Sequence, residues 1–215
     1  YRFEIEKTFI EKPVTELGSL SVNISEGITQ IGDYAFASNA SIASITLPST
    51  LTSIGNCSFK EAVSLTGIVI PDSVLSINDN AFNGCISLSA VTLPTGMDYY
   101  QEGIFSGCTA LKTITFPNTL SAVGDHMFAA CSSLSSVTFN ENATMIGMEG
   151  FANCTSLTSM TLPDSISYIA QGAFKNCYKL AEINIPSNIP SIDAETFMST
   201  AALRRLVLPE SVNSI

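Results

Sequence analysis

Five of the six cysteines recur at one constant interval, which is the spacing from Cys85 to Cys108. Thiols can bind metals, form disulfides or act as nucleophiles. A zinc site is not predicted, because the chain has no Cys-x-x-Cys pair and a single histidine, His126. Residues stacked at the strand spacing of about 4.8 Å would lie close enough for disulfides, but their Cβ vectors would point the same way. We therefore predict reduced, buried thiols that act as small hydrophobes and weak hydrogen-bond donors, with Cys57 outside this column and more reachable. The column consists of Cys85, Cys108, Cys131, Cys154 and Cys177.

Catalytic constellations are missing from the sequence. A Ser-His-Asp arrangement would depend on His126 alone, and there is no Gly-x-Ser-x-Gly elbow. The chain has no phosphate-binding loop and no dinucleotide fingerprint. Polysaccharide cleavage needs paired acids, whereas Glu182 is the one acid expected on the exposed strand faces. We predict that the protein is not an enzyme and needs no cofactor or metal.

Hydroxyl side chains form a second pattern, at the eighth and tenth positions after a repeated phenylalanine. On a strand, positions two apart share one face, so these side chains would form a nearly uncharged polar strip. For any single residue the alternative interpretation is that Thr simply suits a half-exposed strand. For the face as a whole we favour binding, because solenoids use such extended surfaces for partners. The candidate binding residues are Thr46, Thr92, Thr113, Thr115, Ser136, Thr138, Ser159 and Thr161.

The elements that must position these side chains repeat at the same constant interval, without insertion or deletion, from Phe36 onward. Apolar residues follow each phenylalanine at the sixth, ninth and eleventh positions, and a proline usually stands at the twelfth. A fixed period of this length is typical of a solenoid, in which each coil buries its apolar face against its neighbours. The phenylalanine column is Phe36, Phe59, Phe82, Phe105, Phe128, Phe151, Phe174 and Phe197.

Each coil is predicted to contain one short strand with alternating inward and outward side chains, ended by the proline, which cannot donate to a ladder. Inward aliphatic residues follow at the fifteenth and eighteenth positions, such as Leu51 and Ile54. The segment leading into the phenylalanine and cysteine columns is too short for a regular helix, so we expect a helical or 3-10 turn on the outer side. Tyr100 falls in a core position of its coil, and the neighbouring Tyr99 is expected to be exposed.

The pattern Leu-x-x-Ile-x-Leu-Pro, followed by Ile-Gly and Ala-Phe-x-x-Cys, resembles the BspA-like class of leucine-rich repeats from about Val22 to Ile215. The resemblance implies a right-handed leucine-rich-repeat solenoid with a parallel β-sheet on its concave face and short turns or irregular structure on the convex side. It also implies a surface or secreted protein, since members of this class are commonly of that kind, and some of them bind host matrix proteins or other cells. We expect a non-catalytic binding or adhesion module that recognises a protein or glycan through the concave strands. The alternatives are a spacer that projects another domain and a substrate-holding accessory module of an enzyme.

Residues 21–215 are assigned to the solenoid, with about nine coils of which the last is truncated. Residues 1–20 fall outside the repeat and are interpreted as an N-terminal cap or as the end of a preceding segment, because a solenoid must shield its first layer. The chain has the character of a fragment, so its lack of a signal peptide says nothing about secretion.

Composition restricts the partners further. The net charge is −10 and only 13% of the residues are charged, which disfavours nucleic acid and anionic membrane as partners. No run of 18 apolar residues is present, so direct membrane insertion is not predicted. We expect a monomer, with self-association through an exposed sheet edge as the alternative for a fragment.

Overall fold

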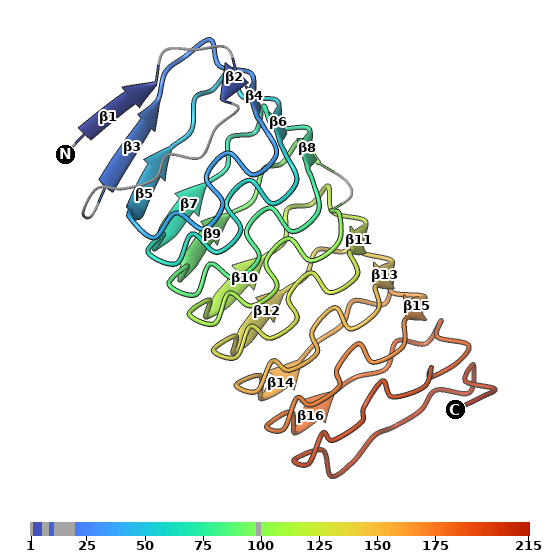
Figure 1. The fold of residues 1–215 in the computed structure, drawn as a ribbon. Helices are drawn as coiled ribbons and strands as arrows, with labels where there is room; N and C mark the ends of the chain where they lie inside the picture. The colour runs from blue at the N-terminus through green and yellow to red at the C-terminus, as the bar shows by residue number, and fades with distance from the viewer. Residues whose placement is uncertain (1, 6–8, 11–19, 98–99) are drawn as a thin grey trace.

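The computed structural model describes residues 2–5, 9–10, 20–97 and 100–215, which form one stacked solenoid (Figure 1). One row of strands runs along the length of the stack, and the paired strands within it are parallel. From β5 onward paired residues lie one repeat apart, as in Thr113 beside Ser136. The predicted parallel-strand solenoid is confirmed. This row consists of β1 (Arg2–Ile5), β3 (Leu20–Ile24), β5 (Ile42–Thr46), β7 (Gly67–Val69), β9 (Ala90–Thr92), β10 (Thr113–Thr115), β12 (Ser136–Thr138), β14 (Ser159–Met160) and β16 (Glu182–Ile183).

A second row of two-residue strands lies along another side of the coils (Figure 1). From β4 onward, each of these strands contains the inward aliphatic of the eighteenth position, such as Ile54, which pairs with Ile77. The sequence indicated these aliphatics but not a second ladder, because two residues are too few to show alternation. The row consists of β2 (Phe9–Ile10), β4 (Gln30–Ile31), β6 (Ser53–Ile54), β8 (Ser76–Ile77), β11 (Ala122–Val123), β13 (Met145–Ile146) and β15 (Tyr168–Ile169).

The N-terminal segment joins both rows. β1 pairs in parallel with β3 over four residues, and β2 pairs with β4. Most of the segment interpreted as a cap, residues 6–8 and 11–19, lies outside the described part of the chain. The division of the chain at residue 20 therefore stays a prediction.

The phenylalanine column is the axis of the core. Neighbouring rings are nearly parallel, with centroid separations from 5.1 to 5.9 Å and interplanar angles of at most 12°. The rings of Phe36 through Phe174 are fully buried, whereas Phe197 in the last coil is partly buried. Parallel rings at these separations are offset stacks, a geometry that aromatic pairs prefer.

The segment around each phenylalanine forms a third ladder, made of turns rather than strands. In the first coil the amides of Tyr34, Phe36 and Ser38 donate to carbonyl oxygens of the next coil at 2.9, 2.7 and 2.6 Å. The same three bonds recur along the solenoid, and all of them run from one coil to the coil that follows. The amides of this ladder therefore all donate in the same direction along the solenoid. In a parallel strand, by contrast, successive amides donate alternately to the two neighbouring strands.

Left-handed backbone explains why these turns do not become helices. Residues two before and two after the phenylalanine have positive φ in every coil, for example Tyr34 at 57° and Ser38 at 54°. The turns close with i to i−3 bonds of the 3-10 type, such as Ala37 to Tyr34 at 3.1 Å, but no helix occurs among the described residues. The expected 3-10 turn is thus a single turn that left-handed residues interrupt.

The cysteine column is buried and unpaired, as predicted. Each of its five thiols donates to the carbonyl oxygen of the phenylalanine in the preceding coil at 3.0 to 3.3 Å. Burial away from water raises the pKa of Cys85, Cys131 and Cys177 to about 12. Cys57 is only half-buried, in agreement with its expected reachability.

Tyr100 occupies its predicted core position and is fully buried. Its hydroxyl donates to the carbonyl oxygen of Pro94 at 3.5 Å, and burial raises the pKa of the phenol. Tyr99 lies outside the described residues. Asn140, which replaces the strand-ending proline in its coil, is buried and donates to the carbonyl oxygens of Pro117 and Leu120. Its side chain thus ties two coils together, a contact that a proline side chain cannot make.

Replacing Phe128 with alanine should lower the free energy of unfolding by about 3–5 kcal/mol, because the cavity lies between two stacked rings. The matched control is Phe197→Ala, which removes a partly buried ring that stacks on Phe174 alone. We expect the control to cost less than half as much in urea unfolding. Equal costs for the two variants would contradict an axial core built from the ring stack.

Alkaline pH should destabilise the protein through the buried thiols. The folded state keeps these thiols neutral up to about pH 12, whereas the unfolded chain ionises near the ordinary value of 9.0. The raised pKa therefore contributes stability that is fully present below pH 9 and is lost as the pH rises towards 12. At pH 10.5 the loss is on the order of 1–2 kcal/mol per thiol.

The measurement is urea unfolding at pH 7.5 and pH 10.5 for the wild type and for a Cys85→Ala, Cys131→Ala, Cys177→Ala variant. Alanine is a suitable replacement because Ala62 occupies the same position in an earlier coil and is fully buried. The variant should lose less stability than the wild type between the two pH values. An equal loss in both proteins would show that the thiols do not carry the effect.

Candidate functional site

The candidate site is the outward side of the long strand row, which we call the strand face. The structure places all eight predicted hydroxyl residues there, and all eight are exposed. Neighbouring coils bring them into register, with Thr113 beside Ser136 and Thr115 beside Thr138. Thr46 is separated from the rest because Val69, 66% exposed, occupies the strip between it and Thr92. The other seven residues form one continuous strip from β9 to the residue after β14.

The hydroxyls of this strip have no partners within the protein. None of the eight forms a hydrogen bond with any residue that the structure describes. The neighbouring column, one residue earlier in each coil, behaves differently. There Thr66 donates to the carbonyl oxygen of Ala43 at 3.1 Å, and Ser89 donates to that of Thr66 at 3.0 Å. The strip therefore offers donors and acceptors to an external ligand, whereas the neighbouring hydroxyls stabilise the stack.

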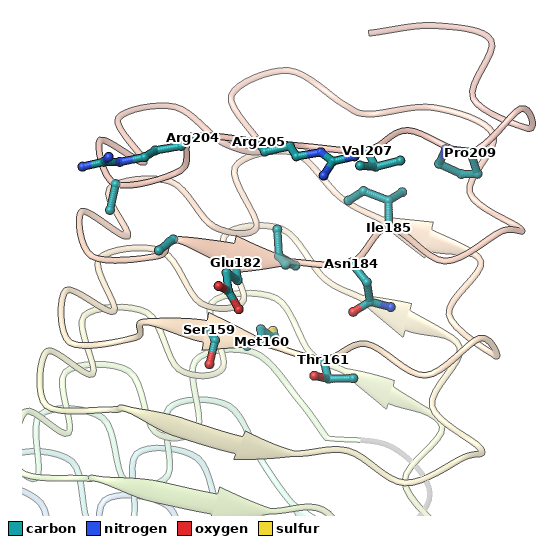
Figure 2. Close-up of a pocket in the computed structure, with 13 residues that line it drawn as sticks. Ser159, Met160, Thr161, Glu182, Asn184, Ile185, Arg204, Arg205, Val207 and Pro209 are labelled. Atoms are coloured by element: carbon teal, nitrogen blue, oxygen red, sulfur yellow. The ribbon is translucent and has the colours of Figure 1, made fainter.

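The strand face is hollowed at its C-terminal end. A depression of about 910 Å³ spans the coils of β14, β16 and the last repeat (Figure 2). Ser159 and Thr161 line it together with Glu182, Asn184 and Arg205. Two of the predicted residues thus belong to the hollow.

The amide of Asn184 forms the fixed part of this hollow. Its Oδ1 accepts from the backbone N–H of Leu162 at 2.7 Å, and its Nδ2 donates to the carbonyl oxygen of the same residue at 2.8 Å. The side chain thereby extends the ladder beyond the end of β14. Arg204 and Arg205 are different, because neither guanidinium forms an ion pair or hydrogen bond with any described residue.

The hydroxyl pattern did not select the charged residues of the hollow. Glu182 and Arg205 occupy the same position in the repeat as Thr113, Ser136 and Ser159, the eighth after the phenylalanine. The repeat already placed Glu182 on the exposed strand faces, and the same register could have placed Arg205 there. The depression itself could not be predicted, because it depends on how long side chains of three coils lie relative to one another.

The strand face carries a charge opposite to that of the whole protein. Among the described residues from β3 to the last coil, its outward positions hold three cations, Lys112, Arg204 and Arg205, and one carboxylate, Glu182. This leaves the face with a net charge of +2, against −10 for the chain. The acidic residues lie mainly on the other sides of the coils.

The lone histidine belongs to the turn ladder. His126 has a φ of 52°, and its Nδ1 lies 3.6 Å from a carboxylate oxygen of Glu149. The strand-face hydroxyls therefore have no imidazole base on their own face. No group of three or more His, Cys, Asp or Glu side chains within the described residues is arranged to hold a metal ion. No helix there is long and apolar enough to cross a membrane.

The fold has solved relatives. A leucine rich cell surface protein from Faecalibacterium prausnitzii shares 27% identity with a TM-score of 0.60, and the match covers 86% of this chain and 59% of that one. The T. pallidum leucine rich repeat protein shares 27% identity with a TM-score of 0.71, covering 76% of this chain and 78% of the other. A leucine-rich repeat protein from Eubacterium ventriosum, at 19% identity and a TM-score of 0.64, covers 89% and 73% and supports the fold alone.

The chain therefore spans less than two thirds of the F. prausnitzii protein. The comparison with curated proteins gives no match. The profile of the BspA type leucine rich repeat region matches in six copies over residues 8–132 and 101–215. Because these two ranges together cover nearly the whole sequence, the chain belongs to the BspA-type leucine-rich repeat family.

Proposed function

We propose that this chain is a non-catalytic binding or adhesion module of a surface or secreted protein, and that its strand face recognises a protein or glycan partner. The observation that carries this proposal is the strip of exposed hydroxyls without internal partners. A surface that served only to hold the stack together would use its hydroxyls as Thr66 and Ser89 do, on the carbonyl oxygens of the preceding coil.

Recognition by this surface rests on many weak contacts. A net hydrogen bond contributes about 0.5–1.5 kcal/mol, so specific binding requires several hydroxyls at once. The ladders hold those hydroxyls at fixed separations, which lowers the ordering cost of binding. No cofactor takes part in this mechanism.

A surface location is supported by the description of the F. prausnitzii relative as a cell surface protein. The role of the whole protein to which such a module belongs is part of the same proposal. The alternative function is a spacer that projects another domain, and the uninterrupted stacking of the coils favours it (Figure 1). The two functions differ in one property, since only the binding module needs an intact strand face.

The test replaces Thr115, Thr138 and Thr161 with glutamate in one variant and measures binding to a panel of matrix proteins and a glycan array. We expect binding to fall at least tenfold, because three carboxylates would remove the hydroxyls and reverse the charge of the face. The matched control carries Asn118→Glu, Thr119→Glu and Ser187→Glu, three exposed residues of turns outside the strand face.

The control should keep the affinity of the wild type within about threefold, since surface charges away from a site change affinity little. Urea unfolding of both variants checks that the fold is retained. Unchanged binding by the strand-face variant would favour the spacer function.

A further inference from the structure

Arg205 is an unpaired cation on the strand face of an acidic protein. It is exposed, it lines the hollow, and it has no bonded partner among the described residues. An arginine fork is a geometric match for a carboxylate, which can accept two parallel hydrogen bonds from it. The charge of the hollow at this coil therefore fits an anionic group of a ligand.

Glu182 lies one coil earlier at the same position of the repeat. The hollow therefore has a positively charged side at Arg205 and a negatively charged side at Glu182. Figure 2 shows its carboxylate directed towards Ser159 and away from the guanidinium of Arg205. A ligand carboxylate on the Glu182 side would be repelled, whereas hydroxyl donors there would be accepted. The order along the face is thus cation, carboxylate, then the neutral hydroxyls of Ser159 and Thr161.

We propose that the hollow binds the carboxylate-bearing terminal sugar of an otherwise neutral oligosaccharide. Arg205 binds the carboxylate, and Glu182 accepts hydrogen bonds from hydroxyl groups of the same sugar. The following sugars lie along the hydroxyl strip towards β12 and β10. This proposal rests on the binding function proposed above and specifies its ligand.

A single negative charge fits better than a polyanion. The strip beyond Glu182 has no cation at the positions of the eight hydroxyls, and Lys112 lies at the margin of the face. A polyanionic chain would also be repelled by the protein, whose net charge is −10. The neutral part of the ligand therefore matches the neutral part of the face.

The side chains of the strand face favour a sugar over a peptide. Protein interfaces depend on buried aromatic and other large anchors. Within the described part of the chain from β3 onward, the exposed large hydrophobic residues of this face are Val69 and Val207, and the exposed tyrosines lie elsewhere. A row of hydroxyls, each able to donate and to accept, suits a polyhydroxylated ligand.

The experiment titrates the protein with 3′-sialyllactose, lactose and 3′-sulfated lactose, followed by NMR chemical-shift changes. We expect binding of 3′-sialyllactose at least tenfold tighter than that of lactose. Arg205→Ala should weaken it by about 10- to 100-fold, the usual loss for a hydrogen bond to a charged group. Glu182→Gln should change the affinity for 3′-sialyllactose less, because the amide oxygen can still accept a hydrogen bond from a sugar hydroxyl.

Lys179→Ala is the matched control, since it removes one exposed positive charge from a turn of the preceding coil that does not line the hollow. We expect the control to retain the affinity within about threefold, as a cation outside the contact should. Equal losses in the Arg205 and Lys179 variants would indicate unspecific charge attraction and overturn the assigned role of Arg205.

Other outcomes also overturn the proposal. These are equal binding of lactose and 3′-sialyllactose, equal binding of the sulfated analogue, and tighter binding of a glutamate-containing peptide at the same residues. A partner from the matrix panel that depends on Thr115, Thr138 and Thr161 while no acidic sugar binds would overturn this proposal alone. The function proposed for the strand face would then stand with a different ligand.

Discussion

The structure depends on one constraint, which is that every coil must lie in register on the coil before it. A single coil has no second layer to cover its apolar side, so its rings and aliphatic side chains are shielded only by the neighbouring coils. The same holds for its backbone, because three ladders per coil donate to or accept from the next coil. The constant length of the repeat satisfies both requirements at once. An insertion would break the ring stack and all three ladders together.

This constraint explains which parts of the molecule could be predicted from the sequence. The phenylalanine and cysteine columns, the long strand row and the core position of Tyr100 follow from the repeat, since a residue in a repeated position shares one environment. The left-handed turns were harder to foresee. Gly84 and Asn80 favour such backbone, but the same positions also hold Tyr34 and His126, which tolerate it only because the turn ladder fixes the chain there.

The candidate site shows the same division. Its hydroxyls could be listed from the repeat, and the structure places them together on one face. Which of the many Ser and Thr residues are free to bind was not visible in the sequence. Thr66 and Thr113 have the same side chain and occupy the seventh and eighth positions after their phenylalanines, yet only Thr66 has its hydroxyl bonded to a carbonyl oxygen of the previous coil. Between these two threonines, a difference of one position in the repeat separates a structural hydroxyl from an available one.

The turn ladder bears on the electrostatics of the whole stack. In a helix, aligned peptide units add up to a macrodipole, whereas in a sheet they nearly cancel. Three turn amides per coil point towards the following coil, but other amides, such as those of Gly55 and Thr66, donate to carbonyl oxygens of the preceding coil. The two sets of dipoles oppose each other along the solenoid, so the stack resembles a sheet and not a helix in this respect. The electrostatic polarity of the C-terminal hollow therefore comes from its side chains, such as Arg205 and Glu182.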